Sequence, residues 1–285
     1  FYAHGDYPDG AFIAECILTT DELKRLVDQH GYASQAARDE WDRRYDASHY
    51  TPRELLARKL FREDRWDEAA AYFPPALAAQ TRRYAELRRL ATRTDVTARQ
   101  RADAYWRAAC IIQAHGRELL FCSFGLDKSQ PDAGRPSHRS PDPGRLEYPN
   151  GWHLYLDYFL PSLRLGRRPN GFVLDLAAPC ADETRRLKAW YAQHIEHPTY
   201  SERMPRYEVL RLGLLAAKEL PDNDPAGAVI LQYIGNLLKY VDPPAATPAY
   251  RLLVNRFGQT PLGATATKNR WFAKDRPKLD EDLLR

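Results

Sequence analysis

Apolar residues recur along most of the chain at intervals of three and four, the spacing that places them on one face of an α-helix. The first clear example is the segment 19–31, where Thr19 and Glu22 form the capping-box pair that starts a helix. Gly31 follows as a stop signal. The apolar stripe of this predicted surface helix consists of Leu23, Leu26 and Val27.

Residues 51–77 predict two helices joined by a short polar turn. Thr51 and Glu54 match the N-cap and third positions of the first helix, with a proline between them at the first position. The second helix begins near Trp66, and the pair Pro74–Pro75 stops or kinks it. The segment is therefore predicted to be a helical hairpin.

This hairpin carries large and small residues at spacings that let two helices approach closely. The matching residues are Leu56, Ala57, Leu60, Ala69, Phe73 and Ala76. In order and spacing they resemble the core positions of a tetratricopeptide repeat (TPR), a helix–turn–helix unit. The repeat is degenerate, because Arg53 stands where the family has a tryptophan and Thr81 where it has a closing proline.

A second likeness lies near the end of the chain, where a tyrosine-containing helix ends in an aromatic–glycine turn before Thr-Pro and an alanine-rich helix. Its residues are Tyr250, Leu253, Phe257, Thr260, Pro261, Ala264 and Ala266. This pattern resembles the repeats of bacterial envelope TPR proteins, including outer-membrane assembly lipoproteins. The two likenesses cover residues 51–77 and 205–272. They favour a bacterial protein, and they favour the envelope or periplasm over the cytoplasm without fixing the compartment.

Other segments complete a helical pattern. Thr97 and Gln100 predict a helix start and Gly116 its end. The run 226–244 is so apolar that we expect it to be buried between neighbouring helices. The last residues, 273–285, are highly charged, and we expect them to be loosely attached.

The fold predicted from these elements is all-α, a TPR-like right-handed α-solenoid of antiparallel helical hairpins. We expect an N-terminal helical-repeat half at residues 1–124 and a C-terminal TPR-like half with a charged tail at 151–285. Residues 125–150 are rich in Pro, Gly, Ser and Asp without apolar periodicity, which predicts a long loop or linker between the halves.

Charge and hydropathy restrict the classes of partner. The chain has 42 basic and 38 acidic residues, a formal charge of +4, which is too small to indicate a nucleic-acid protein. No stretch of 18 or more consecutive apolar residues occurs, so no membrane span is expected. The sequence begins without Met and contains only Met204, from which we expect a processed form or fragment of a larger protein.

Candidate chemistry is sparse. The four cysteines, Cys16, Cys110, Cys122 and Cys180, form no CxxC pair, and we expect buried thiols rather than a disulfide framework or zinc site. His194 and His197 lack the HExxH arrangement, and a proline after them favours a helix end. Glycine-rich phosphate loops and GxSxG are absent from the sequence. We therefore assign no catalytic residue, metal or cofactor.

A cluster of aromatic and basic residues follows the predicted linker. Its members are Trp152, His153, Tyr155, Arg164, Arg167 and Arg168. Arginine and aromatic side chains are frequent anchors of protein interfaces. The sequence thus predicts a non-catalytic scaffold or adaptor that binds a protein or peptide partner here. The alternative is a helical enzyme or glycan-acting protein whose site joins His153, His194 or His197 to a carboxylate.

Overall fold

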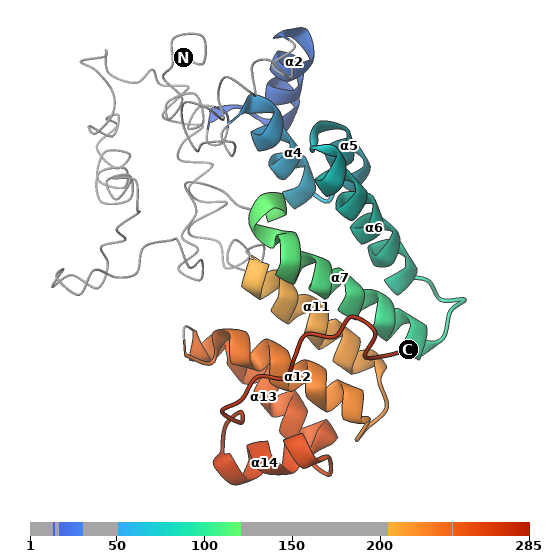
Figure 1. Ribbon diagram of the computed structural model, residues 1–285, viewed down its shortest axis with the longest axis vertical. Coiled ribbons are helices and arrows are strands. Elements are labelled where there is room, and N and C mark those ends of the chain that lie inside the picture. Colours follow the sequence, from blue (N-terminus) through green and yellow to red (C-terminus); the bar gives the residue numbers. More distant parts are fainter. Residues whose placement is uncertain (1–13, 15–16, 31–50, 121–204, 241) are drawn as a thin grey trace, which may run out of the picture. The chain divides into compact units, whose positions relative to one another are not determined.

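A computed structural model describes residues 14, 17–30, 51–120, 205–240 and 242–285, and these residues are helical with no strand among them (Figure 1). The helices are α2 (Thr20–His30), α4 (Pro52–Arg62), α5 (Trp66–Tyr72), α6 (Pro75–Ala91), α7 (Ala98–Leu120), α11 (Pro205–Glu219), α12 (Pro225–Leu238), α13 (Pro243–Phe257) and α14 (Pro261–Asn269). The all-α prediction is confirmed over this part of the chain.

The helices belong to two compact units. The first contains α2, α4 and α5, and the second contains α6, α7, α11 to α14 and the C-terminal tail. The predicted linker, residues 125–150, lies outside the described residues. None of the described helices is long and apolar enough to cross a membrane.

Helix starts in the first unit use the predicted caps. The Thr19 amide donates to Glu22 Oε2 at 2.9 Å, and the Glu22 amide donates back to Thr19 Oγ1 at 3.2 Å. The Glu54 amide donates to Thr51 Oγ1 at 3.2 Å. These side chains satisfy backbone donors that the first helical turn leaves open, and so they fix where α2 and α4 begin.

The hairpin of α4 and α5 buries the predicted repeat positions, with one exception. The side chains that are 5% exposed or less are Leu56, Ala57, Leu60, Ala69 and Phe73. The sixth, Ala76, is exposed, because α5 ends at Tyr72 and Pro75 opens a new helix. The second helix of the hairpin thus has only seven residues, and the likeness to a full TPR unit stops at the Pro74–Pro75 pair.

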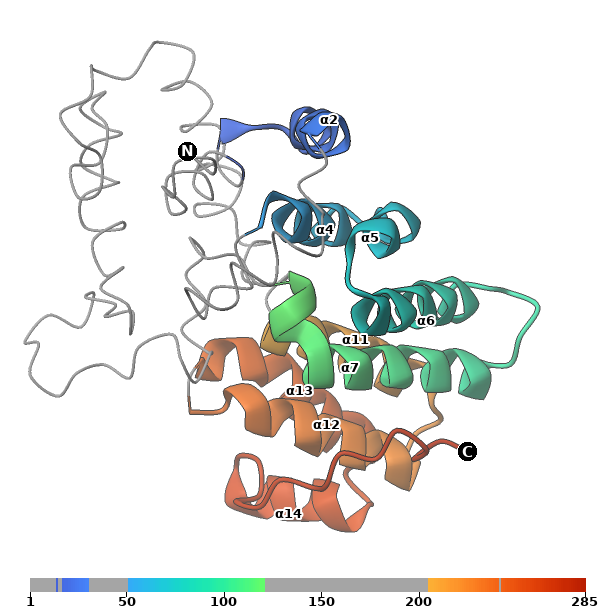
Figure 2. The same ribbon diagram turned by 45° about the horizontal axis from the view of Figure 1, so that its top comes forward.

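The second unit packs its helices as neighbours. Helix α7 contacts α6 and α11, and α12 contacts α11, α13 and α14 (Figure 2). As expected from its composition, α12 is buried on most of its surface. Asp224 is the N-cap of α12, and its side chain accepts from the Ala226 amide at 2.8 Å.

Gly116 is not the end of a helix, which corrects the prediction. Helix α7 continues through it to Leu120, and Gly116 is buried in the helix interior. A Cβ at Gly116 would lie 2.8 Å from Cβ of Pro205, the first residue of α11. The glycine is therefore explained by close helix packing rather than by a left-handed cap.

A similar close approach at Gly263 gives a stability prediction. A Cβ there would lie 1.9 Å from the Phe257 carbonyl oxygen, which is backbone and cannot move by a rotamer change. We expect Gly263→Ala to lower the free energy of unfolding by about 1–3 kcal/mol. Its neighbour Ala264 is exposed on the same helix, so Ala264→Ser should stay within about 0.5 kcal/mol. Urea unfolding of both variants tests this, and equal midpoints would contradict the packing argument.

Candidate peptide-binding surface

The residues predicted from the sequence to bind a partner lie outside the described part of the chain. They are Trp152, His153, Tyr155, Arg164, Arg167 and Arg168, and the same holds for His194 and His197 of the alternative site. Within the described residues, no three His, Cys, Asp or Glu side chains lie close enough to hold a metal ion. The arrangement that bears on function is elsewhere, at the C-terminal tail.

The tail was expected to be loosely attached, and that prediction is wrong. Residues 273–285, drawn in dark red in Figures 1 and 2, run as a non-helical segment across α12 to the N-terminal half of α7, with a turn at residues 281–284. The segment is held at two places, one near each of its ends. The charged composition suggested solvation, but the contacts use mainly its backbone carbonyls.

The first attachment lies on α12 and uses buried side-chain donors. Lys239 Nζ donates to the carbonyls of Ala273 at 2.8 Å and Lys274 at 3.0 Å. Gln232 Nε2 donates to the Ala273 carbonyl at 3.0 Å. Asn236 Nδ2 donates to the carbonyl of Asp275 at 3.1 Å. Because Lys239 is 4% exposed and Gln232 fully buried, this attachment belongs to the core of the unit.

The second attachment lies on a surface that we call the tail-binding face, formed by Arg83 of α6 and by Arg99, Trp106 and Arg107 of α7. Trp106 Nε1 donates to the Asp280 carbonyl at 2.6 Å, and Arg99 Nε to the Leu284 carbonyl at 3.2 Å. Arg107 pairs with Asp282 at 2.6 Å, and Arg83 with Glu281 at 3.2 Å. The face thus contacts both the backbone and the carboxylates of a segment that turns at residues 281–284.

Leu284 is the main apolar contribution of the tail to this attachment. Its side chain is 3% exposed. Burying a leucine contributes about 1.5–3 kcal/mol, whereas a surface ion pair contributes about 0–1 kcal/mol. The carboxylates of Glu281 and Asp282 are 46% and 53% exposed. Their ion pairs therefore fix the position of the tail more than they stabilise its attachment.

The donors of the tail-binding face are positioned by partners other than the tail. Arg107 also pairs with Asp103 one helical turn away, at 2.9 Å, and Arg99 pairs with Asp224 at 3.1 Å. The Trp106 ring packs edge-on against Tyr233, with centroids 5.7 Å apart. These contacts orient the side chains whether or not a peptide lies on them, which lowers the ordering cost of binding one.

A buried side chain also donates to backbone carbonyls within the first unit. Lys59 of α4 is 9% exposed, and its Nζ donates to the carbonyls of Ala14 at 3.2 Å and Leu18 at 2.7 Å. Both carbonyl acceptors precede α2. A buried lysine with three donors is suited to satisfy several such carbonyls at once.

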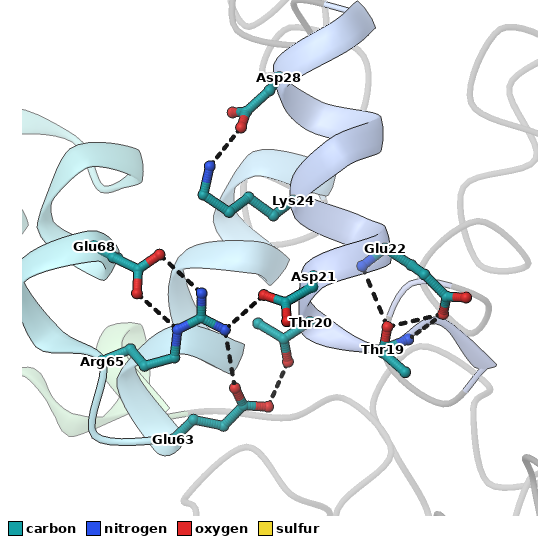
Figure 3. Close-up of polar contacts among 9 residues, drawn as sticks. All are labelled: Thr19, Thr20, Asp21, Glu22, Lys24, Asp28, Glu63, Arg65 and Glu68. Atoms are coloured by element: carbon teal, nitrogen blue, oxygen red, sulfur yellow. Dashed lines mark hydrogen bonds and ion pairs between the residues drawn. The ribbon is translucent and has the colours of Figure 1, made fainter.

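Charged residues also join α2 to the turn between α4 and α5, as Figure 3 shows. Arg65 donates to both carboxylate oxygens of Glu68 at 2.8 Å and to Asp21 Oδ1 at 2.8 Å. Glu63 accepts from the Thr20 hydroxyl. Arg65 faces three carboxylates and offsets part of their charge, and this cluster is a structural junction.

A buried carboxylate in the second unit also accepts hydrogen bonds from neighbouring side chains. Glu208 Oε1 accepts from the Tyr84 hydroxyl at 2.8 Å, and both of its oxygens accept from Arg211 at 2.6 and 2.7 Å. Arg88 lies 3.4 Å from the same carboxylate. Burial raises the pKa of Tyr84 well above 10, and the nearby Glu208 charge adds to the shift. The network ties α6 to α11 in the core.

Cys110 is a buried free thiol, as expected, and it faces the acidic end of the tail. Burial raises its pKa to about 12, with a further contribution from the Glu281 carboxylate. The thiol is therefore protonated at neutral pH, and it acts as a small apolar side chain in the interior of α7.

The first tail attachment should depend on Lys239. In Lys239→Met the side chain keeps its length but cannot donate to the Ala273 and Lys274 carbonyls, which should cost about 1–3 kcal/mol. Amide exchange of residues 272–285 should then quicken by about tenfold or more. Lys274→Met is the matched control, because that side chain is exposed. Equal exchange in both variants would mean that Lys239 does not hold the tail.

The charged contacts around α2 predict a loss of stability in acid. Hydrogen bonds from Lys24 lower the pKa of Asp28 below 3.8, and those from Arg65 lower the pKa of Glu68 below 4.5. A depressed folded-state pKa gives stability that is present above these ordinary values and is lost as the pH falls through the lower ones.

Both carboxylates are nearly half exposed, so we expect the effect on α2 to be about 0.5 kcal/mol. Amide exchange of α2, corrected for intrinsic rates between pH 6 and pH 2, measures it. Arg65→Gln should reduce the pH dependence, because it removes the partner of Glu68. The interpretation is wrong if the amide exchange of α2 depends on pH to the same extent in the variant and in the wild type.

No known protein family, curated protein or solved structure matches this chain. Its likeness to TPR proteins is therefore one of residue pattern. What the described residues show is an all-helical arrangement with packed neighbouring helices, which is compatible with a helical repeat.

Proposed function

We propose that this protein is a non-catalytic scaffold that binds extended segments of other proteins. Its helical hairpins would continue as a TPR-like right-handed solenoid, in which each unit buries its apolar face against the next and leaves side chains along an open surface. The buried positions of the α4–α5 hairpin support this reading, as do the packed helices of the second unit.

The observation that carries the proposal is how the second unit holds a non-helical segment of the chain. Side-chain donors of α7 and α12 contact the carbonyls of residues 273, 274, 275, 280 and 284. Non-helical peptide segments present such carbonyls whatever their sequence, so this is the chemistry that peptide recognition requires. A helical surface that binds its own non-helical segment this way can bind another.

The aromatic and basic residues at 152–168 are the proposed contact region for a protein partner. Arginine and aromatic side chains contribute most of the binding energy at many interfaces. The segment contains three arginines within five residues, Arg164, Arg167 and Arg168. We propose that these guanidinium groups contact acidic or carbonyl groups of the partner.

Charge reversal tests this assignment. The variant Arg164→Glu/Arg167→Glu/Arg168→Glu should lose at least nine-tenths of the partner captured by the immobilised chain, identified by mass spectrometry after washes of increasing salt. Helicity by circular dichroism should be unchanged. The control carries the same change of charge at three exposed arginines of the described helices, Arg25, Arg82 and Arg251. Equal capture by both variants would refute the assignment, and turnover in a substrate screen without capture would favour an enzyme.

A further inference from the structure

We propose that the tail-binding face is a docking site for an acidic, leucine-bearing peptide of a partner protein, and that the chain's own residues 280–284 occupy it until the partner displaces them. The inference rests on the proposed scaffold function and names a ligand class for one of its surfaces. It follows from the residues of the tail that the face contacts.

The occupant defines the chemistry of the ligand. Glu281 and Asp282 meet Arg83 and Arg107, and Leu284 supplies the buried apolar side chain two residues later. The backbone contacts to residues 280 and 284 accept any amino acid. The matching ligand is a segment with two adjacent carboxylates, followed at the second position beyond them by a large aliphatic residue, that can form the same turn as residues 281–284.

The two attachments of the tail differ in how easily they can open. The first depends on Gln232 and Lys239, which are buried, and on Phe272, which is 4% exposed. The second depends on one buried side chain of the tail, Leu284, on ion pairs whose carboxylates are about half exposed, and on the hydrogen bonds from Trp106 and Arg99. Opening the second attachment therefore removes one buried side chain of the tail from the face, whereas opening the first unpacks Gln232, Lys239 and Phe272.

The connection between the attachments allows separate opening. Among the described residues, none forms a hydrogen bond or ion pair with residues 277–279, and Leu279 is 40% exposed. Arg276 contributes a cation–π contact with Tyr233, its guanidinium 5.4 Å from the ring centroid. Residues 280–285 can thus leave the face while residues 272–276 stay in place.

The face would remain organised after the tail leaves. Arg107 keeps Asp103, Arg99 keeps Asp224, and Trp106 keeps its contact with Tyr233. A partner segment would then find donors already in position, and the tethered tail would act as an intramolecular competitor at high effective concentration. Binding by the wild type should accordingly be weak, and it should strengthen when the tail is weakened.

The test uses the full chain and a fluorescent synthetic peptide with the sequence of residues 278–285, measured by anisotropy. The tail-release variant Asp282→Ala/Leu284→Ala removes two of the three tail side chains that contact the face and leaves the face unchanged. We expect this variant to bind the peptide at least tenfold more tightly than the wild type. Adding Arg107→Ala to the variant, or replacing both acidic residue 282 and leucine 284 of the peptide with alanine, should abolish binding.

Amide exchange makes each outcome decisive. In the wild type, residues 280–284 should exchange faster than residues 272–275, because the second attachment opens alone. Equal protection of both stretches would identify a permanent strap and overturn the inference. So would a folded tail-release variant that fails to bind the peptide, or a wild type that dimerises through exchanged tails in analytical ultracentrifugation. Capture through the segment 152–168 is measured separately, so it can succeed when this inference fails.

Discussion

The structure depends on a requirement of the backbone: every carbonyl that is buried outside a helix needs a donor. An all-helical body offers no edge strand to supply one, so non-helical segments can pack on it only where side chains donate. Lys59 does this for the stretch before α2, and Gln232 and Lys239 do it for the stretch after α14. These buried donors determine where a non-helical part of the chain can pack against the helices.

The course of the tail follows from a corner of aromatic residues just before it. Arg270 ends α14 with a φ of 54°, which turns the chain back on itself. Trp271 and Phe272 then pack against Tyr250, with ring centroids 5.1 and 5.8 Å away. Phe272 fits because Gly235 has no Cβ, which would lie 2.1 Å from its ring. The ring thereby places the Ala273 carbonyl within reach of Lys239.

The elements that could be predicted from sequence are those whose cause is local. Thr19, Thr51 and Thr97 each cap a helix through residues three positions away, and such pairs are visible in the sequence. Gly116 could not be interpreted this way, because its reason is Pro205, a residue far along the chain. The attachment of the tail was missed for the same reason. Its acceptors are backbone carbonyls, which leave no mark in the side-chain pattern, although Leu284 in a charged segment was a usable signal.

The net charge of the chain is close to zero, but acidic side chains lie on the tail and basic side chains on the helices that it contacts. This separation of charge affects binding. Along the tail, carboxylates meet arginines of α6 and α7, while the carbonyls meet donors that carry no sequence preference. Exposed pairs of this kind are screened by salt and contribute little energy each, so they select a ligand without holding it strongly. The buried donors of α12 act in the opposite way, because they hold the chain without selecting. The tail is therefore held firmly at one end and by charge-selective contacts at the other, an arrangement that fits the scaffold function proposed for this protein.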